Sequence, residues 1–206
     1  MAVILKRTRS LCPICNAVLD ATVVEEDGKV WLERSCPEHG HFRDLYWSDA
    51  ELWKKFEQYE SLGRGIENPQ RLAPSDGCPH YCGICSNHKS STLLANIDLT
   101  NRCNLNCDFC FANARACGYI YEPTFDQIVD MMKLLRNEMP VPAPAVQFSG
   151  GEPTMREDLP LIIRTAKELG FPQVQVATNG IKIAQDPSYL EELREAGLST
   201  LYLHFD

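Results

Sequence analysis

The sequence has no apolar run that approaches the roughly 20 residues needed to cross a membrane. Its apolar start, residues 1–5, is shorter than the core of a signal peptide and precedes the first basic residues, so it does not predict secretion. The sequence also lacks a basic stripe, and its net charge is −8, which argues against nucleic acid as the main partner. We therefore expect a globular, soluble and cytoplasmic protein without a transmembrane segment.

Cysteine, by contrast, is abundant: the 206 residues include ten cysteines, most of them closely spaced. Thiols stay reduced in the cytoplasm, so this clustering predicts metal ligands rather than disulfides. The surrounding patterns predict three parts. Residues 1–62 form a metal-binding hairpin and a helix, residues 63–92 a linker with an auxiliary cysteine motif, and residues 93–206 an α/β core.

The first cysteine group lies across a predicted β-hairpin. Strand-like segments 21–26 and 29–34 flank Asp27-Gly28, a strong hairpin turn signal. Two knuckles across such a hairpin can place four ligands around one ion, namely Cys12, Cys15, Cys36 and His39. His41 is an alternative fourth ligand, and either histidine could instead lie on the surface. A closed set of this kind resembles zinc ribbons and rubredoxin-like iron sites, and it predicts mononuclear Zn or Fe with a structural or electron-transfer role.

The helix after this hairpin has a capping-box start at Ser48 and ends at Gly63, with Leu52, Phe56 and Tyr59 on one face. From residue 93, strand and helix patterns alternate. We expect strands at 93–99, 145–148, 174–177 and 198–205, helices after capping boxes at Thr124 and Thr154, and a helix after Asp186. In the first of these helices, the inward residues would be Phe125, Ile128, Met132 and Leu135. This alternation predicts an α/β fold with a parallel sheet and crossover helices, either open or closed into a barrel. An apolar last strand without a following helix favours a truncated or split gene product.

The second group, Cys103, Cys107 and Cys110, follows the first strand of this α/β part in the pattern CxxxCxxC. Three thiolates from one loop can bind three irons of a 4Fe-4S cube and leave the fourth iron without a protein ligand. The loop would lie at the carboxyl edge of the sheet, where α/β enzymes place their active sites. A structural zinc site or a set of buried thiols is the alternative.

Two further motifs follow the next strands. Ser149-Gly150-Gly151-Glu152-Pro153 comes after the second strand, and Thr178-Asn179-Gly180 comes after the third. Together with the CxxxCxxC motif, which has Phe109 before its last cysteine, they resemble the radical S-adenosylmethionine (SAM) superfamily. The glycines suit a close backbone approach to a ligand, whereas the segment at Asn179 could equally be a polar turn.

The resemblance implies that Cys103, Cys107 and Cys110 hold a 4Fe-4S cluster whose open iron binds SAM. It implies cofactor-binding roles for Gly150, Gly151, Glu152, Pro153 and Asn179, the first four holding the methionyl amino group. One electron, from a donor such as ferredoxin or flavodoxin, would cleave SAM into a 5′-deoxyadenosyl radical that abstracts hydrogen from the substrate. The usual core has six βα units, whereas this chain would hold a partial (βα) radical SAM barrel of about three units plus a strand. The sequence assigns no residue a catalytic role on the substrate.

A second CxxxCxxC motif lies upstream, in the linker, at Cys78, Cys82 and Cys85. It lacks an aromatic residue before its third cysteine and does not follow a strand. We therefore expect an auxiliary iron–sulfur cluster or metal site, completed by His88, by Cys117 or by a residue beyond the present end. A zinc knuckle is one alternative, and a second is that this motif, rather than the downstream one, binds SAM.

The whole arrangement resembles a subfamily described as archaeal tetraether lipid synthases, which join lipid tails, and also as dihydropterin methyltransferases. This resemblance favours radical C–C coupling on a lipid-like substrate and leaves methyl transfer to a pterin second. A noncatalytic metal-binding fragment that pairs with a separately encoded C-terminal half is a third reading, from a different functional class.

Overall fold

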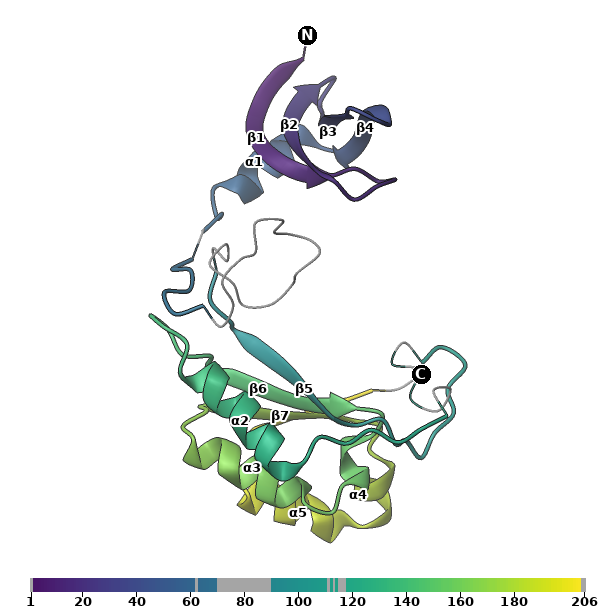
Figure 1. Cartoon of the computed structure of the whole chain (residues 1–206), viewed down its shortest axis with the longest axis vertical. Coiled ribbons are helices and arrows are strands. Elements are labelled where there is room, and N and C mark those ends of the chain that lie inside the picture. The colour runs from purple at the N-terminus through teal and green to yellow at the C-terminus, as the bar shows by residue number, and fades with distance from the viewer. Residues whose placement is uncertain are drawn as a thin grey trace. The chain divides into compact units, whose positions relative to one another are not determined.

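The computed structural model describes residues 2–61, 63–69, 90–110, 112, 114 and 118–204 (Figure 1). They form two compact units, one within residues 2–61 and the other comprising residues 63–69 and the chain from residue 90 onward. Within these ranges, no helix is long and apolar enough to cross a membrane. The auxiliary motif at Cys78, Cys82 and Cys85, with His88 and Cys117, lies outside the described residues, so its metal site stays a prediction.

The N-terminal unit is a four-stranded antiparallel sheet in the order β1-β2-β3-β4. The predicted hairpin is its centre, formed by β2 (Val18–Glu26) and β3 (Lys29–Cys36). Asp27 and Gly28 join these strands with φ angles of 52° and 71°, the left-handed pair that a tight two-residue turn requires. The sequence analysis missed β1 (Val3–Leu11) and β4 (Gly40–Trp47). Both are edge strands with mostly exposed side chains, so neither has a clear alternation of apolar and polar residues.

The core of this unit is small. Val23, Val30, Ala50 and Trp53 are buried together, with Leu5 and Leu32 packed against them. Helix α1 (Ala50–Glu57) contributes Trp53, which is 8% exposed. Each fully buried side chain supplies about 1.5–3 kcal/mol, so this core gives a gross gain of roughly 10 kcal/mol, which the entropy cost of ordering the chain largely offsets.

The apolar face that the sequence places on α1 is largely exposed. Leu52, Phe56 and Tyr59 are 42%, 57% and 77% exposed. The contact with the sheet is made by Trp53 and Ala50 instead, which lie on a different stripe of the helix. The helix also begins one residue later than the capping pattern suggested, because the Asp49 side chain accepts the N–H of Leu52.

The C-terminal unit is a four-stranded parallel sheet in the order β5-β6-β7-β8, which confirms the α/β expectation. Its strands are β5 (Leu94–Thr100), β6 (Ala145–Gly150), β7 (Gln173–Thr178) and β8 (Thr200–Leu203). The connecting helices are α2 (Phe125–Arg136), α3 (Leu159–Glu168), α4 (Ile181–Gln185) and α5 (Pro187–Glu195). Figure 1 shows these helices on one face of the sheet. The arrangement matches the predicted partial (βα) barrel, whose loops after the strands gather at one edge.

One continuous apolar core fills the space between this sheet and its helices. Phe148, Val174 and Val176 of the strands are completely buried, as are Ile128 and Met132 of α2. The inward face predicted for α2 is therefore confirmed. Its capping box is confirmed as well, because the Thr124 hydroxyl accepts the N–H of Gln127 while the Gln127 side chain accepts the N–H of Thr124.

The second predicted capping box, at Thr154, is wrong. Residues Pro153–Met155 form a single 3₁₀ turn, and α3 begins at Leu159 after Asp158. The Thr154 hydroxyl donates to the Glu152 carboxylate rather than capping a helix. This hydroxyl therefore belongs to the network around Glu152 at the carboxyl edge of the sheet.

At the opposite, amino edge of the sheet, both flanks of segment 70–89 are held by the turn that follows α2. The Asn68 amide donates to the carbonyl of Asn137 over 2.6 Å and accepts the N–H of Met139 over 2.7 Å. On the other flank, the Thr92 hydroxyl donates to Glu138 over 2.8 Å. Residues 68 and 92 are thus fixed to the same three-residue turn, 137–139.

Replacing Trp53 with Ala should destabilise the N-terminal unit by about 3 kcal/mol or more, because it removes the largest buried side chain of a small core. Phe56→Ala is the matched control on the same helix and should cost about 1 kcal/mol or less, since Phe56 is exposed and only its ring contact with Trp47 is lost. Denaturant unfolding followed by circular dichroism would measure both. The opposite ranking would contradict the burial of Trp53 against the sheet.

Candidate metal and cofactor sites

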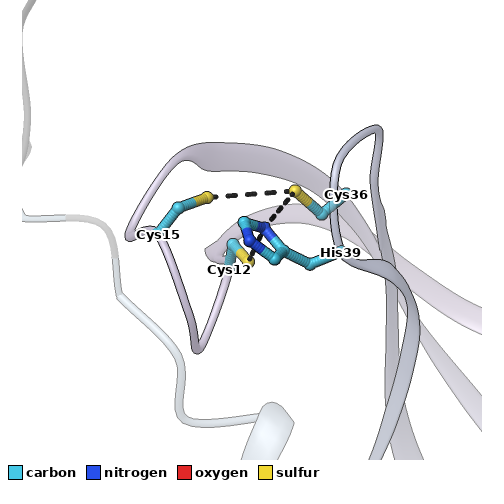
Figure 2. Close-up of side chains that lie close together, drawn as sticks. All are labelled: Cys12, Cys15, Cys36 and His39. Atoms are coloured by element: carbon cyan, nitrogen blue, oxygen red, sulfur yellow. Dashed lines mark hydrogen bonds between the residues drawn. The ribbon is translucent and has the colours of Figure 1, made fainter.

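The N-terminal unit brings together Cys12, Cys15, Cys36 and His39. One ligand atom from each residue lies within 4.8 Å of the others, with Cys12 and Cys15 on the turn between β1 and β2 and the other two at the turn between β3 and β4 (Figure 2). The sulfurs of Cys15 and Cys36 are 3.9 Å apart, and His39 Nδ1 is 3.5 Å from the Cys36 sulfur. Sulfurs bound to one tetrahedral ion at about 2.3 Å lie about 3.8 Å apart, so the residues present fit such an ion. His41 instead contacts Ser35.

Local backbone geometry builds both knuckles. In the first, Cys12 accepts the N–H of Asn16 and donates its own N–H to Ala17, and Asn16 turns the chain with φ 59°. In the second, Gly40 follows His39 with φ 80°, a conformation that favours glycine. The buried Arg34 donates through Nε to the carbonyl of Leu11, directly before the first ligand.

The unit also prepares the Cys12 thiol for ionisation. Burial raises the pKa of this thiol, but the backbone N–H groups of Cys15 and Ile14 and the neighbouring thiols outweigh that effect and lower the pKa to about 6. The thiolate is the form that binds a metal, so Cys12 is ready to coordinate at neutral pH.

The second set of cysteines lies on the loop that leaves β5. Cys103 is partly buried, whereas Cys107 and Cys110 are exposed. Within the described residues, only the N-terminal set gathers three or more candidate ligand atoms within 4.8 Å of one another, so the sulfurs of Cys103, Cys107 and Cys110 do not all lie that close together. A wider spacing is consistent with a cubane cluster, in which each thiolate binds a different iron.

The base of this loop is closed by polar contacts. The Asn101 side chain donates to the carbonyl of Tyr119 and accepts the N–H of Tyr121. One step further along, Glu122 accepts hydrogen bonds from the Thr100 hydroxyl and from Arg102 Nε. Burial raises the pKa of Glu122, but those two donors outweigh burial and lower it below its ordinary value. The chain is therefore held in place both where it enters the cysteine loop and where it leaves it.

The two glycines of the second motif lie against the chain that enters the cysteine loop. The N–H of Gly151 donates to the carbonyl of Thr100 over 2.7 Å, and the N–H of Glu152 donates to that of Arg102 over 2.8 Å. A Cβ at Gly150 would come within 2.2 Å of the Thr100 carbonyl oxygen, and one at Gly151 within 2.3 Å of the Arg102 oxygen. Gly150 also has φ 131°. The absence of side chains here thus serves a backbone-to-backbone contact that the sequence analysis did not foresee.

Glu152 is 1% exposed, and its carboxylate has hydrogen-bond donors from two strands' ends. Its Oε1 accepts from the N–H and hydroxyl of Thr154 and from the hydroxyl of Thr178. Its Oε2 accepts the N–H of Asn179 over 2.9 Å. The Asn179 side chain in turn donates to Asn104 Oδ1 over 2.7 Å, which joins this network to the cysteine loop.

A further residue that the sequence analysis missed is Arg156. Its NH1 donates to the carbonyls of Leu99 and Pro123, and its other nitrogens pair with Asp158. The pairing raises the pKa of Arg156 and lowers that of Asp158. The sequence shows only an arginine two positions before an acidic residue. The burial of Arg156, which is 7% exposed, and its backbone acceptors depend on the fold.

Beside Cys103 lies a cavity of about 570 Å³, lined among others by Arg102, Tyr119 and Met155. Its size is within the range of small-molecule sites. Cys103 therefore adjoins an open space at the carboxyl edge of the sheet.

Residues 97–206, more than half of the sequence, match the radical SAM superfamily. The chain belongs to this superfamily. Residues 4–48 match the HMPTM N-terminal zinc ribbon domain. Superfamily membership implies a 4Fe-4S cluster and SAM as cofactors, and the ribbon match agrees with the four-ligand geometry of a Zn or Fe site.

Individual relatives cover the chain to different extents. It is 58% identical over 201 residues to the 7,8-dihydro-6-hydroxymethylpterin dimethyltransferase of Methanocaldococcus jannaschii. This match covers 98% of the chain and 39% of the relative. The chain is 34% identical to a GTP 3′,8-cyclase of Clostridium acetobutylicum and 36% identical to an Fe-coproporphyrin III synthase of Methanosarcina barkeri. Each of these two matches covers 53% of this chain and, respectively, 33% and 26% of the relative. The chain thus spans about two fifths or less of these relatives.

Replacing Cys36 with Ala should unfold mainly the N-terminal unit, because a core this small depends on its metal while the α/β unit has its own core. Hydrogen exchange measured by mass spectrometry should show lost protection in residues 3–47 and unchanged protection in residues 94–203. Cys103→Ala is the control and should leave residues 3–47 protected. Equal loss across both units after Cys36→Ala would contradict their independence.

Proposed function

We propose that this chain forms the zinc-ribbon and cluster-binding part of a radical SAM methyltransferase that acts on a dihydropterin carrying a hydroxymethyl group. The observation that carries this proposal is the relative of that name, which matches 98% of the chain at 58% identity, across both units. The cyclase and synthase relatives match only about half of the chain. Methyl transfer to a pterin, the second reading of the sequence, is therefore preferred over coupling of lipid tails.

Within this proposal, Cys103, Cys107 and Cys110 hold the 4Fe-4S cluster that binds SAM. The support is their place on one loop at the carboxyl edge of the sheet, with Cys107 and Cys110 exposed and a cavity beside Cys103. When bound, the cluster would supply the electron that cleaves SAM. Asn101 and Glu122 hold the base of the loop through hydrogen bonds, so the loop that carries the three thiols has a fixed starting position.

The segment expected to bind SAM, Gly150, Gly151, Glu152 and Pro153, is proposed to form the wall next to this loop and to meet SAM through its backbone, with Asn179 beside it. The support is the direct hydrogen bonding of that segment to Thr100 and Arg102, immediately before Cys103. An electron donor such as ferredoxin or flavodoxin is proposed as a partner, and a separately encoded C-terminal half is proposed to supply any missing part of the substrate pocket.

For the auxiliary motif we keep the expectation of a second iron–sulfur cluster on Cys78, Cys82 and Cys85, with a zinc knuckle as the alternative. A noncatalytic role for the chain is disfavoured because the cysteine loop and the Gly150–Pro153 segment are held together by direct backbone hydrogen bonds.

A triple variant of Cys103, Cys107 and Cys110 to Ala should lose the change that SAM causes in the electron paramagnetic resonance spectrum of the reduced protein, since SAM binds the open iron. The matched triple variant of Cys78, Cys82 and Cys85 should keep that change while binding less iron. Both should be measured after anaerobic reconstitution at saturating SAM. The reverse pattern would move the SAM site to the upstream motif, and zinc without labile sulfide in the unmodified chain would contradict a cluster altogether.

The protein that contains this chain should transfer an isotope-labelled methyl group to a 6-hydroxymethyl dihydropterin in the presence of SAM and a low-potential reductant. Mass spectrometry of the pterin would detect the label. The triple variant at residues 103–110 serves as the control and should yield none. SAM cleavage that depends on a lipid with unlinked alkyl chains, and not on the pterin, would overturn the substrate assignment and favour the lipid reading.

A further inference from the structure

We propose that Asn179 is a positioning residue for the cysteine loop, and that Glu152 orients Asn179 instead of binding the cofactor directly. The proposal rests on the proposed cluster at Cys103, Cys107 and Cys110, and it deepens that assignment. Glu152, Asn179 and Asn104 would form a rigid, hydrogen-bonded bridge at the carboxyl edge of the sheet.

The carboxylate of Glu152 has little capacity for a ligand. It accepts four hydrogen bonds from the protein itself, three on Oε1 and one on Oε2, and the residue is 1% exposed. An ionised carboxylate offers about four lone-pair positions in total. A cofactor ammonium group would have to displace Thr154, Thr178 or Asn179, or reach a carboxylate closed off by them, whereas the present arrangement satisfies both oxygens.

Asn179 is fixed at each of its polar groups. Its backbone N–H donates to Glu152 Oε2, and its Oδ1 accepts the N–H of Ile181 over 3.1 Å. These two contacts leave the amide nitrogen aimed at Asn104 Oδ1, to which it donates over 2.7 Å. Since an amide with its oxygen held has a defined nitrogen direction, the contact to Asn104 follows from the other two.

Asn104 is the residue directly after Cys103 in the CxxxCxxC motif. On the other side of Cys103, the carbonyl of Arg102 accepts the N–H of Glu152 over 2.8 Å. The first cluster cysteine is thus held on both sides by the same polar group of residues, through Glu152 before it and through Asn179 after it. The remaining cysteines, Cys107 and Cys110, are exposed, so the position of the loop depends on these contacts and on its base.

The test is a double-mutant cycle on the 206-residue chain, reconstituted anaerobically, with Asn104→Ala, Asn179→Ala and the double variant. Two quantities are measured: the rate of iron loss to a chelator and the electron paramagnetic resonance spectrum of the reduced cluster without SAM. Each single variant should lose iron several-fold faster and broaden the spectrum. The double variant should match Asn179→Ala, because the contact between Asn104 and Asn179 is already absent in that single variant. The control is Gln147→Ala, which removes an amide–amide hydrogen bond to Asn96 on neighbouring strands of the same sheet, away from the loop.

Glu152→Gln separates positioning from direct binding, with Thr178→Val as a second variant that removes one donor should the first fail to fold. Positioning predicts faster iron loss in both, with the SAM-induced spectral change retained in whatever cluster remains. Unchanged iron loss with a weakened SAM response would overturn the role of Glu152. The bridge would be overturned if the Asn104 and Asn179 variants lost iron no faster than Gln147→Ala. It would also be overturned if the effects of the Asn104 and Asn179 substitutions on the rate of iron loss multiplied independently in the double variant. An unmodified chain that takes up no cluster would refute the proposed function itself, a result distinct from either of these.

Discussion

The close approach of the Gly150–Gly151 backbone to residues 100–102 is the contact on which the C-terminal unit's carboxyl edge depends. It aligns the ends of β5 and β6, so that two backbone hydrogen bonds join the turn after β6 to the chain just before Cys103. Any side chain at either glycine would collide with a carbonyl oxygen that cannot move without shifting β5 or the cysteine loop. Glu152 then enters a pocket where Thr154, Thr178 and Asn179 meet its carboxylate. The order along the motif therefore has a physical meaning: the glycines allow the contact and the glutamate connects it to the third strand.

The two units use cysteine in different ways. In the N-terminal unit the four ligand atoms lie close enough to enclose one ion, and the small apolar core indicates that much of the stability comes from metal binding. In the C-terminal unit a large apolar core lies between the sheet and its helices, and the cysteines lie on a loop outside that core. The first arrangement suits a structural site with no open position, and the second suits a site where chemistry can occur.

The sequence predicted the parts of the fold that have a strong local signal. The Asp27-Gly28 hairpin, the capping box at Thr124 and the alternating strands of the α/β unit each depend on a few neighbouring residues, and the structure contains all of them. Strands β1 and β4 were missed because an edge strand with both faces largely exposed carries no alternating pattern. The sequence placed Leu52, Phe56 and Tyr59 on one face of α1, but it could not show that Trp53 packs on the sheet, because that contact depends on the strands beneath the helix. The roles of Thr154, Arg156 and Glu122 could not be read from sequence, because their partners come from other elements.

The clamp at the amino edge of the sheet has a consequence for the auxiliary cysteine motif. Asn68 and Thr92 are both fixed to the turn 137–139, so the ends of the intervening segment are brought together by the protein and not by a metal. The entropy lost when a flexible loop closes grows with the logarithm of its length. Here the folding of the α/β unit already brings the two ends together, so metal binding does not have to supply that part of the free energy. When the two ends of a segment are already held together, the ligands on it have a higher effective concentration than ligands on an open chain. Metal uptake at Cys78, Cys82 and Cys85 would then be thermodynamically linked to the folding of a sheet that contributes no ligand to it.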